Sequence, residues 1–137
     1  MKIKYDLNLM NYRTIFENIT HAQVKDCFLK DDLFLVVVKE NEIGKAIGKG
    51  GMNIRALENK FNKKIKIVEF SDDLIKFTKN WVNPVKIKDI KLEDDVMTLF
   101  VSGIKEKGQI IGRDSKNLHE LKDILGLYFH VKNVRVQ

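Results

Sequence analysis

The sequence is poor in the residues that cross-link or interrupt a chain. Of its 137 residues, one is a cysteine, Cys27, and one is a proline, Pro84. A single cysteine excludes an intramolecular disulfide and a cysteine-rich zinc site. No apolar run approaches the roughly 18 residues that a membrane-spanning helix requires, and no apolar segment of a secretory signal follows the basic start. We therefore expect a soluble, cytoplasmic protein with no membrane partner.

The excess positive charge is confined to one segment. The chain has 25 Lys and Arg residues against 19 Asp and Glu residues, a formal net charge of +6. Residues 43–66 hold seven basic residues and the single acid Glu58, and the rest of the chain holds 18 of each sign. A concentrated basic patch indicates a polyanionic partner, and the alternative is a lysine-rich helix face in solvent.

An internal repeat of about 65 residues covers the chain. Residues 24–38 align without a gap with residues 87–101, and Gly44–Gly48 then aligns with Gly108–Gly112. The aligned identities include Lys25/Lys88, Asp26/Asp89, Leu29/Leu92, Asp31/Asp94, Asp32/Asp95, Val38/Val101 and Asn53/Asn117.

Both repeats predict the same order of elements: helix, strand, strand, helix, helix, strand. The prediction rests on apolar spacing for the helices and on β-branched and aromatic runs for the strands. The expected elements are 11–20, 24–29, 33–39, 43–47, 53–61 and 65–70, then 72–83, 86–92, 96–102, 105–111, 116–125 and 129–136. We therefore expect an α/β (α+β) protein of two tandem domains, residues 1–70 and 71–137, each with a three-stranded sheet. The helix at about 72–83 joins them, and we expect the Trp81 region to pack them into one rigid unit.

The glycine-rich segment between the two central helices of the first repeat is the main candidate site. Without a Cβ, its glycines let the backbone approach a ligand closely. The helix that follows presents free N–H groups and a positive dipole end to an anion. We therefore expect a phosphate cradle at Gly48, Lys49, Gly50 and Gly51, and flanking contacts to a single-stranded nucleic acid at Lys45, Asn53 and Arg55.

The second repeat departs from this pattern. Gly112, Arg113, Asp114 and Ser115 stand where the first repeat has its four loop residues. Asp114 would repel a phosphate, Ser115 is expected to cap the following helix, and Arg113 and Lys116 would compensate in part. The second loop is either a weaker phosphate site or a structural copy that only extends the surface.

The run Ala46–Ile54 carries a G-x-x-G turn between two helices, which resembles the KH RNA-binding domain, whose loop clamps about four nucleotides of backbone. The element order resembles the type II form of that fold. The tandem pair, with Val68–Asp73 after the first copy, resembles the short archaeal form of the transcription factor NusA, which lacks the extra polymerase-binding and S1 regions of its bacterial relative. This resemblance implies a non-enzymatic protein that binds single-stranded RNA in transcription elongation, pausing or termination. It implies no cofactor, and as partners the nascent transcript complex or RNA polymerase; we expect a monomer.

Other functions find less support in the sequence. The loop matches neither the P-loop spacing nor the G-x-G-x-x-G fingerprint of nucleotide-binding enzymes. The histidines His21, His119 and His130 lie far from one another and from Cys27 in the sequence, so no metal site is expected. A ribosome- or RNA-processing-associated KH protein stays open as an alternative. A helix-hairpin-helix DNA binder is disfavoured by the strands that flank each glycine loop.

Overall fold

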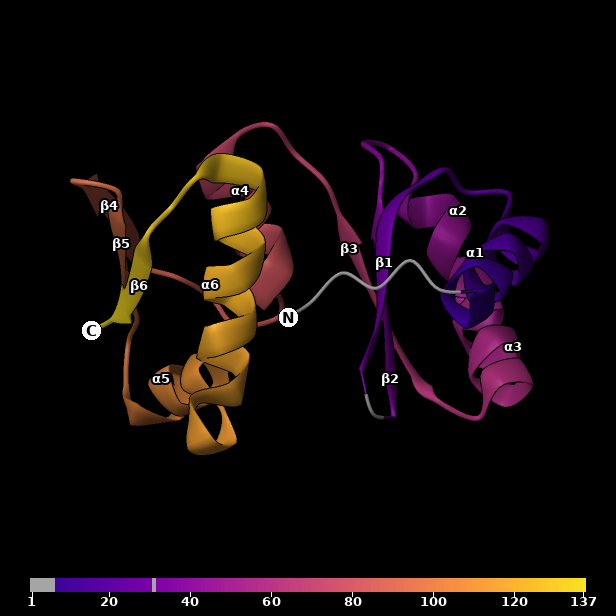
Figure 1. Cartoon of the computed structure of the whole chain (residues 1–137). Coiled ribbons are helices and arrows are strands. Elements are labelled where there is room, and N and C mark those ends of the chain that lie inside the picture. The colour runs from indigo at the N-terminus through magenta and orange to yellow at the C-terminus, as the bar shows by residue number, and fades with distance from the viewer. Residues whose placement is uncertain (1–6, 31) are drawn as a thin grey trace. The chain divides into compact units, whose positions relative to one another are not determined.

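The computed structural model describes residues 7–30 and 32–137 and separates into two compact units (Figure 1). The first unit ends at Ser71, and the second runs from Asp72 to Gln137. The expected first domain began at residue 1; its residues 1–6 and Asp31 lie outside the described residues.

The elements follow the predicted order in both units. The first unit contains α1 (Leu7–Thr20), β1 (Val24–Lys30), β2 (Leu33–Val38), α2 (Ile43–Ile47), a 3-10 turn (Lys49–Gly51), α3 (Met52–Phe61) and β3 (Lys64–Glu69). The second contains α4 (Leu74–Val82), β4 (Asp89–Glu93), β5 (Val96–Phe100), α5 (Ile104–Ile111), a 3-10 turn (Arg113–Ser115), α6 (Lys116–Phe129) and β6 (Asn133–Val136). The expected fold class is confirmed.

Each unit has one three-stranded sheet with the same topology. The strand orders are β1-β2-β3 and β4-β5-β6. In each sheet the central strand pairs antiparallel with the strand before it and parallel with the last strand. All helices of a unit lie on one side of its sheet (Figure 1). The last strand of each unit is an edge strand, and it contacts the two helices that flank the glycine loop.

The core of the first unit forms between β2 and the helices. Phe34, Val36 and Val38 alternate along β2 and are fully buried in one cluster with residues of α1, α2 and α3. Within this cluster, the Phe34 and Phe61 rings pack edge-to-face with centroids 5.5 Å apart. This packing anchors α3, the helix that follows the glycine loop, against the sheet.

The second unit shows where local sequence preference is overruled. The sequence predicts that the helix ends at Leu125 and that a strand begins at Phe129, but α6 continues to Phe129 and β6 begins only at Asn133. Tyr128 and Phe129 lie in the last turn of α6, with ring centroids 5.6 and 5.7 Å from that of buried Phe77. Aromatic residues favour strands when considered locally, and here their contact with Phe77 favours another helical turn.

Two further boundaries differ from the sequence prediction. β4 begins at Asp89 and not at Lys86, and α1 begins at Leu7, four residues before the predicted Asn11. Asp73 caps the start of α4, because its carboxylate accepts hydrogen bonds from the N–H groups of Ile75 and Lys76. Among the described helices, none has the length and apolar character needed to cross a bilayer.

Candidate nucleic-acid interface

The first glycine loop connects α2 to α3 through a turn that begins at Gly48. Its N–H donates to the carbonyl of Gly44 at 3.0 Å and closes α2. Its backbone, with φ 76° and ψ 166°, lies in a region that is essentially restricted to glycine. A Cβ at this position would stand 2.8 Å from the Asn53 side chain, so Gly48 is required by both conformation and space.

Asn53 crosses the loop and holds its two ends together. Its Nδ2 atom donates to the carbonyl oxygen of Lys45 at 2.8 Å, which joins the start of α3 to α2. The sequence predicts Asn53 as a flanking contact to RNA. The one sequence feature that agrees with a structural role is its alignment with Asn117 in the second repeat. The structure shows the amide of Asn53 engaged within the loop.

The middle of the loop presents backbone donors. Gly50 (φ 61°, ψ 23°) and Gly51 (φ 76°, ψ 17°) are both left-handed, and the N–H of Gly51 donates to the carbonyl of Gly48 at 3.1 Å. Within residues 7–30 and 32–137, the N–H groups of Lys49 and Gly50 donate to no protein acceptor. Successive unengaged N–H groups in a turn of this kind form a concavity that binds anions.

Arg55 fixes the outer edge of the loop. Its Nη1 atom donates to the carbonyl oxygen of Gly50 at 2.7 Å, one turn of α3 away from the loop. The sequence predicts Arg55 as a flanking RNA contact; in the structure its guanidinium is bonded to the loop backbone.

Positive charge lies beside these donors. Lys45 and Lys49 are exposed on either side of Gly48. The Lys45 ammonium pairs with the Glu42 carboxylate at 3.4 Å, and the same carboxylate accepts the N–H of Gln23 at 2.8 Å. The Gln23 hydrogen bond is the main reason that the pKa of Glu42 is lowered from its usual value, and the pairing with Lys45 contributes. Glu42, which the sequence does not single out, thus ties the start of α2 to Gln23, the residue before β1.

Apolar side chains lie on α2, the helix before the loop, and on β3, which contacts that helix. Ile43 of α2 and Ile65 and Ile67 of β3 are partly buried and pack on the core. Both α2 and α3 contact β3. The exposed parts of these side chains offer apolar contact surface to the faces of unstacked bases.

The second loop reproduces the backbone of the first loop with one glycine, Gly112, in place of three. Gly112 (φ 75°, ψ 174°), Asp114 (φ 55°, ψ 30°) and Ser115 (φ 60°, ψ 22°) match Gly48, Gly50 and Gly51. Asn117 donates from Nδ2 to the carbonyl of Gln109 at 3.2 Å, as Asn53 does in the first loop. The two loops therefore share one geometry.

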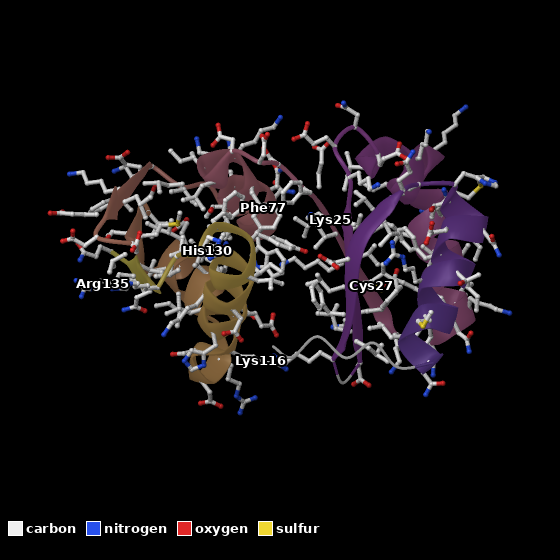
Figure 2. All side chains as sticks on the ribbon, turned by 45° about the horizontal axis from the view of Figure 1, so that its top comes forward. Lys25, Cys27, Phe77, Lys116, His130 and Arg135 are labelled. Atoms are coloured by element: carbon white, nitrogen blue, oxygen red, sulfur yellow. The ribbon has the colours of Figure 1, made fainter. Side chains whose placement is uncertain are left out.

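The side chains of the second loop are different. Ser115 was expected to cap α6, but its side chain makes no capping bond, so that prediction is wrong. An N-cap residue normally has extended backbone, whereas Ser115 is left-handed. Arg113 and Asp114 are exposed, and Lys116 begins α6 directly after the loop (Figure 2). His119 occupies the position of Arg55.

Comparisons with known proteins agree with this architecture. Residues 11–96 match the model of the KH domain. A probable transcription termination protein NusA from Methanococcus vannielii is 37% identical over 99% of this chain and 80% of its own length. A protein of the same name from Methanocaldococcus jannaschii is 35% identical over 88% of this chain and 68% of its own length. Another from Thermoplasma acidophilum is 31% identical over 99% of this chain and 96% of its own length. One solved crystal structure superposes with a TM-score of 0.75 at 30% identity over 96% of this chain and 99% of the other.

Proposed function

The chain belongs to the KH-domain family, with two tandem type II KH domains of the archaeal NusA kind, and from this premise we propose that it binds single-stranded RNA in transcription termination or elongation. The relatives from three archaea share the name of a transcription termination protein. The RNA is a segment of the nascent transcript, and the protein acts by binding and not by catalysis. A role beside RNA polymerase belongs to the same proposal.

The first loop is the proposed phosphate site. The observation that carries this assignment is the pair of unengaged N–H groups at Lys49 and Gly50, held in a turn of two left-handed glycines. Lys45 and Lys49 add charge to these dipoles, and Gly48 keeps side-chain bulk away from the backbone. In this arrangement the N–H groups bind a phosphate oxygen and the lysines neutralise neighbouring phosphates.

The bases of the bound strand would extend over the aliphatic surface between α2 and β3. Ile43, Ile65 and Ile67 supply contact there without selecting one base. The backbone is thus recognised by the loop, and the bases add apolar contact. Preference for RNA over DNA then depends on the 2′-hydroxyl.

The second loop is proposed as the weaker site. Gly112, Arg113, Asp114, Ser115 and Lys116 form a turn of the same backbone shape, with cations at Arg113 and Lys116. The exposed carboxylate of Asp114 opposes an incoming phosphate. Any difference between the sites is therefore one of side-chain charge and support, since the backbone angles agree.

The test compares the wild type with the double variant Lys49→Asp, Gly50→Asp in titrations with single-stranded RNA and matching DNA at two salt concentrations. Asp is compatible with the left-handed backbone of Gly50, because Asp114 adopts it at the equivalent position. We expect RNA affinity to fall at least about tenfold. The logarithm of the wild-type affinity should decrease with the logarithm of salt concentration, with a slope of about −0.7 per neutralised phosphate.

The matched control is Asn59→Glu, Lys60→Glu, which changes the charge equally at exposed positions near the far end of α3. We expect it to bind RNA much more tightly than the loop variant. Equal losses in the two variants would show a nonspecific basic face and would refute the loop assignment. Equal binding of RNA by the loop variant and the wild type would refute it as well.

A further inference from the structure

We propose that Arg55 is a positioning residue that keeps the first loop in its anion-binding shape, and that the absence of this clamp at the second loop makes the two sites unequal. This inference rests on the proposed function. It changes the role of Arg55 from a phosphate ligand to a support for the N–H groups of the loop.

The geometry of the guanidinium is the first observation. The 2.7 Å bond from Arg55 Nη1 reaches the carbonyl of Gly50, the residue at the centre of the turn. The Gly50 carbonyl belongs to the peptide that continues to Gly51, so its orientation sets the plane of that peptide. Holding it toward α3 preserves the turn whose opposite edge carries the N–H groups of Lys49 and Gly50.

The freedom of Gly50 makes such a support necessary. A Cβ at Gly50 would meet no atom within 4 Å apart from its chain neighbours, so no side chain packs against this side of the residue. Glycine also has more backbone freedom than any other residue. Asn53 secures the two ends of the loop through Lys45, and the bond from Arg55 restrains the middle.

The second loop supplies the comparison. The bond that joins the two ends of the loop is present, because Asn117 Nδ2 donates to the carbonyl of Gln109. His119 stands at the position of Arg55, and in the described structure its side chain makes no hydrogen bond to the carbonyl of Asp114. An imidazole is too short to replace a guanidinium over one helical turn. Asp114 and Ser115 have less backbone freedom than glycine, which offsets the missing bond only in part.

The binding test uses Arg55→Lys and Arg55→Gln, with Lys60→Gln as the control for loss of one exposed charge on the same helix. A lysine ammonium stops about one bond short of the Nη1 position and loses the carbonyl while keeping the charge. We expect both Arg55 variants to bind single-stranded RNA about fivefold more weakly. Arg55→Lys should keep the wild-type salt slope. Lys60→Gln should bind nearly as tightly as the wild type.

A phosphate-ligand role gives a different pattern. If Arg55→Lys binds like the wild type and Arg55→Gln reduces the salt slope by about 0.7, Arg55 contacts a phosphate and the proposal is wrong. Wild-type affinity in both variants would also overturn it. Arg55 is exposed, so the variants are expected to fold, and unchanged melting temperatures would verify this.

A measurement on the free protein separates this inference from the proposed function. Amide hydrogen exchange at Gly51, whose N–H bonds to Gly48, should accelerate in both Arg55 variants and not in Lys60→Gln. The reciprocal change His119→Arg should slow exchange at Ser115, which bonds to Gly112, while His119→Lys should not. Unchanged exchange in the Arg55 variants refutes the clamp even if RNA binds. If the wild type does not bind RNA, the proposed function fails and the exchange result still decides the clamp.

Discussion

Three glycines within seven residues of the chain should respond to alanine substitution in three different ways. Gly44 lies inside α2 with open space around a built Cβ, Gly50 is left-handed with open space, and Gly48 has both a positive φ and a close neighbour. All three carry no side chain and lie in the same basic segment. Differences in stability among the three alanine variants therefore reflect the local backbone conformation and the space around each new Cβ.

The expected free-energy changes follow from these environments. Gly44→Ala should stabilise the first unit by about 0.5–1 kcal/mol, because alanine has less freedom to lose in a helix. Gly50→Ala should cost about 1–2 kcal/mol for a left-handed alanine. Gly48→Ala should cost about 1–3 kcal/mol for the backbone strain. Displacing Asn53, which lies 2.8 Å from the new Cβ, costs about 1 kcal/mol more through its bond to Lys45.

Thermal unfolding followed by circular dichroism gives the assay, with amide spectra used to assign the transition of the first unit. For a domain of this size about 1 kcal/mol shifts the melting temperature by roughly 4–8 °C. We therefore expect Gly48→Ala to lower it by at least about 10 °C and Gly44→Ala to raise it by a few degrees. A Gly48→Ala variant as stable as Gly50→Ala would refute the reasoning, because neither the close contact nor the backbone region would then matter.

Two further predictions concern the second loop and the buried thiol. Asp114→Asn removes the charge and keeps a residue that tolerates left-handed backbone. In the Lys49→Asp, Gly50→Asp background, it should raise RNA affinity about two- to fivefold in a titration. A lower affinity would contradict a repulsive role of Asp114. Burial raises the pKa of Cys27 to about 11. The unfolded chain therefore releases this proton first, and stability should decline as pH rises from about 8.5 toward that value. Denaturant titrations of the wild type and Cys27→Ala should show this decline in the wild type alone, and identical pH profiles would exclude Cys27 as its source.

The fold could be predicted from local patterns because most of its elements carry strong periodic signals. Phe34, Val36 and Val38 mark the buried face of β2, and the repeat supplied every element twice. Boundaries were less predictable where a contact distant in the sequence decides them. The extension of α6 through Tyr128 and Phe129 depends on Phe77, which lies about fifty residues earlier.

The candidate site was predictable in its location and less so in the roles of its residues. Glycine content and charge located the loop, and both repeats showed an asparagine at the same spacing. The expectation that Ser115 caps α6 failed because residue type alone does not reveal a left-handed backbone. Asn53 and Arg55 were predicted as flanking RNA contacts, and that assignment did not consider their bonds to Lys45 and Gly50.

By itself, the amino-acid sequence determined the two repeats, the element order and the segment that carries the excess charge. These properties follow from composition and from the periods of helices and strands, which are local. The tertiary structure alone decided that Asp114 and Ser115 adopt the backbone of Gly50 and Gly51, that Asn53 joins the ends of the loop, and that Arg55 bonds its centre. Such features depend on dihedral angles and on distances between side chains and carbonyls, which are defined only once the helices that flank each loop have packed on their own sheet.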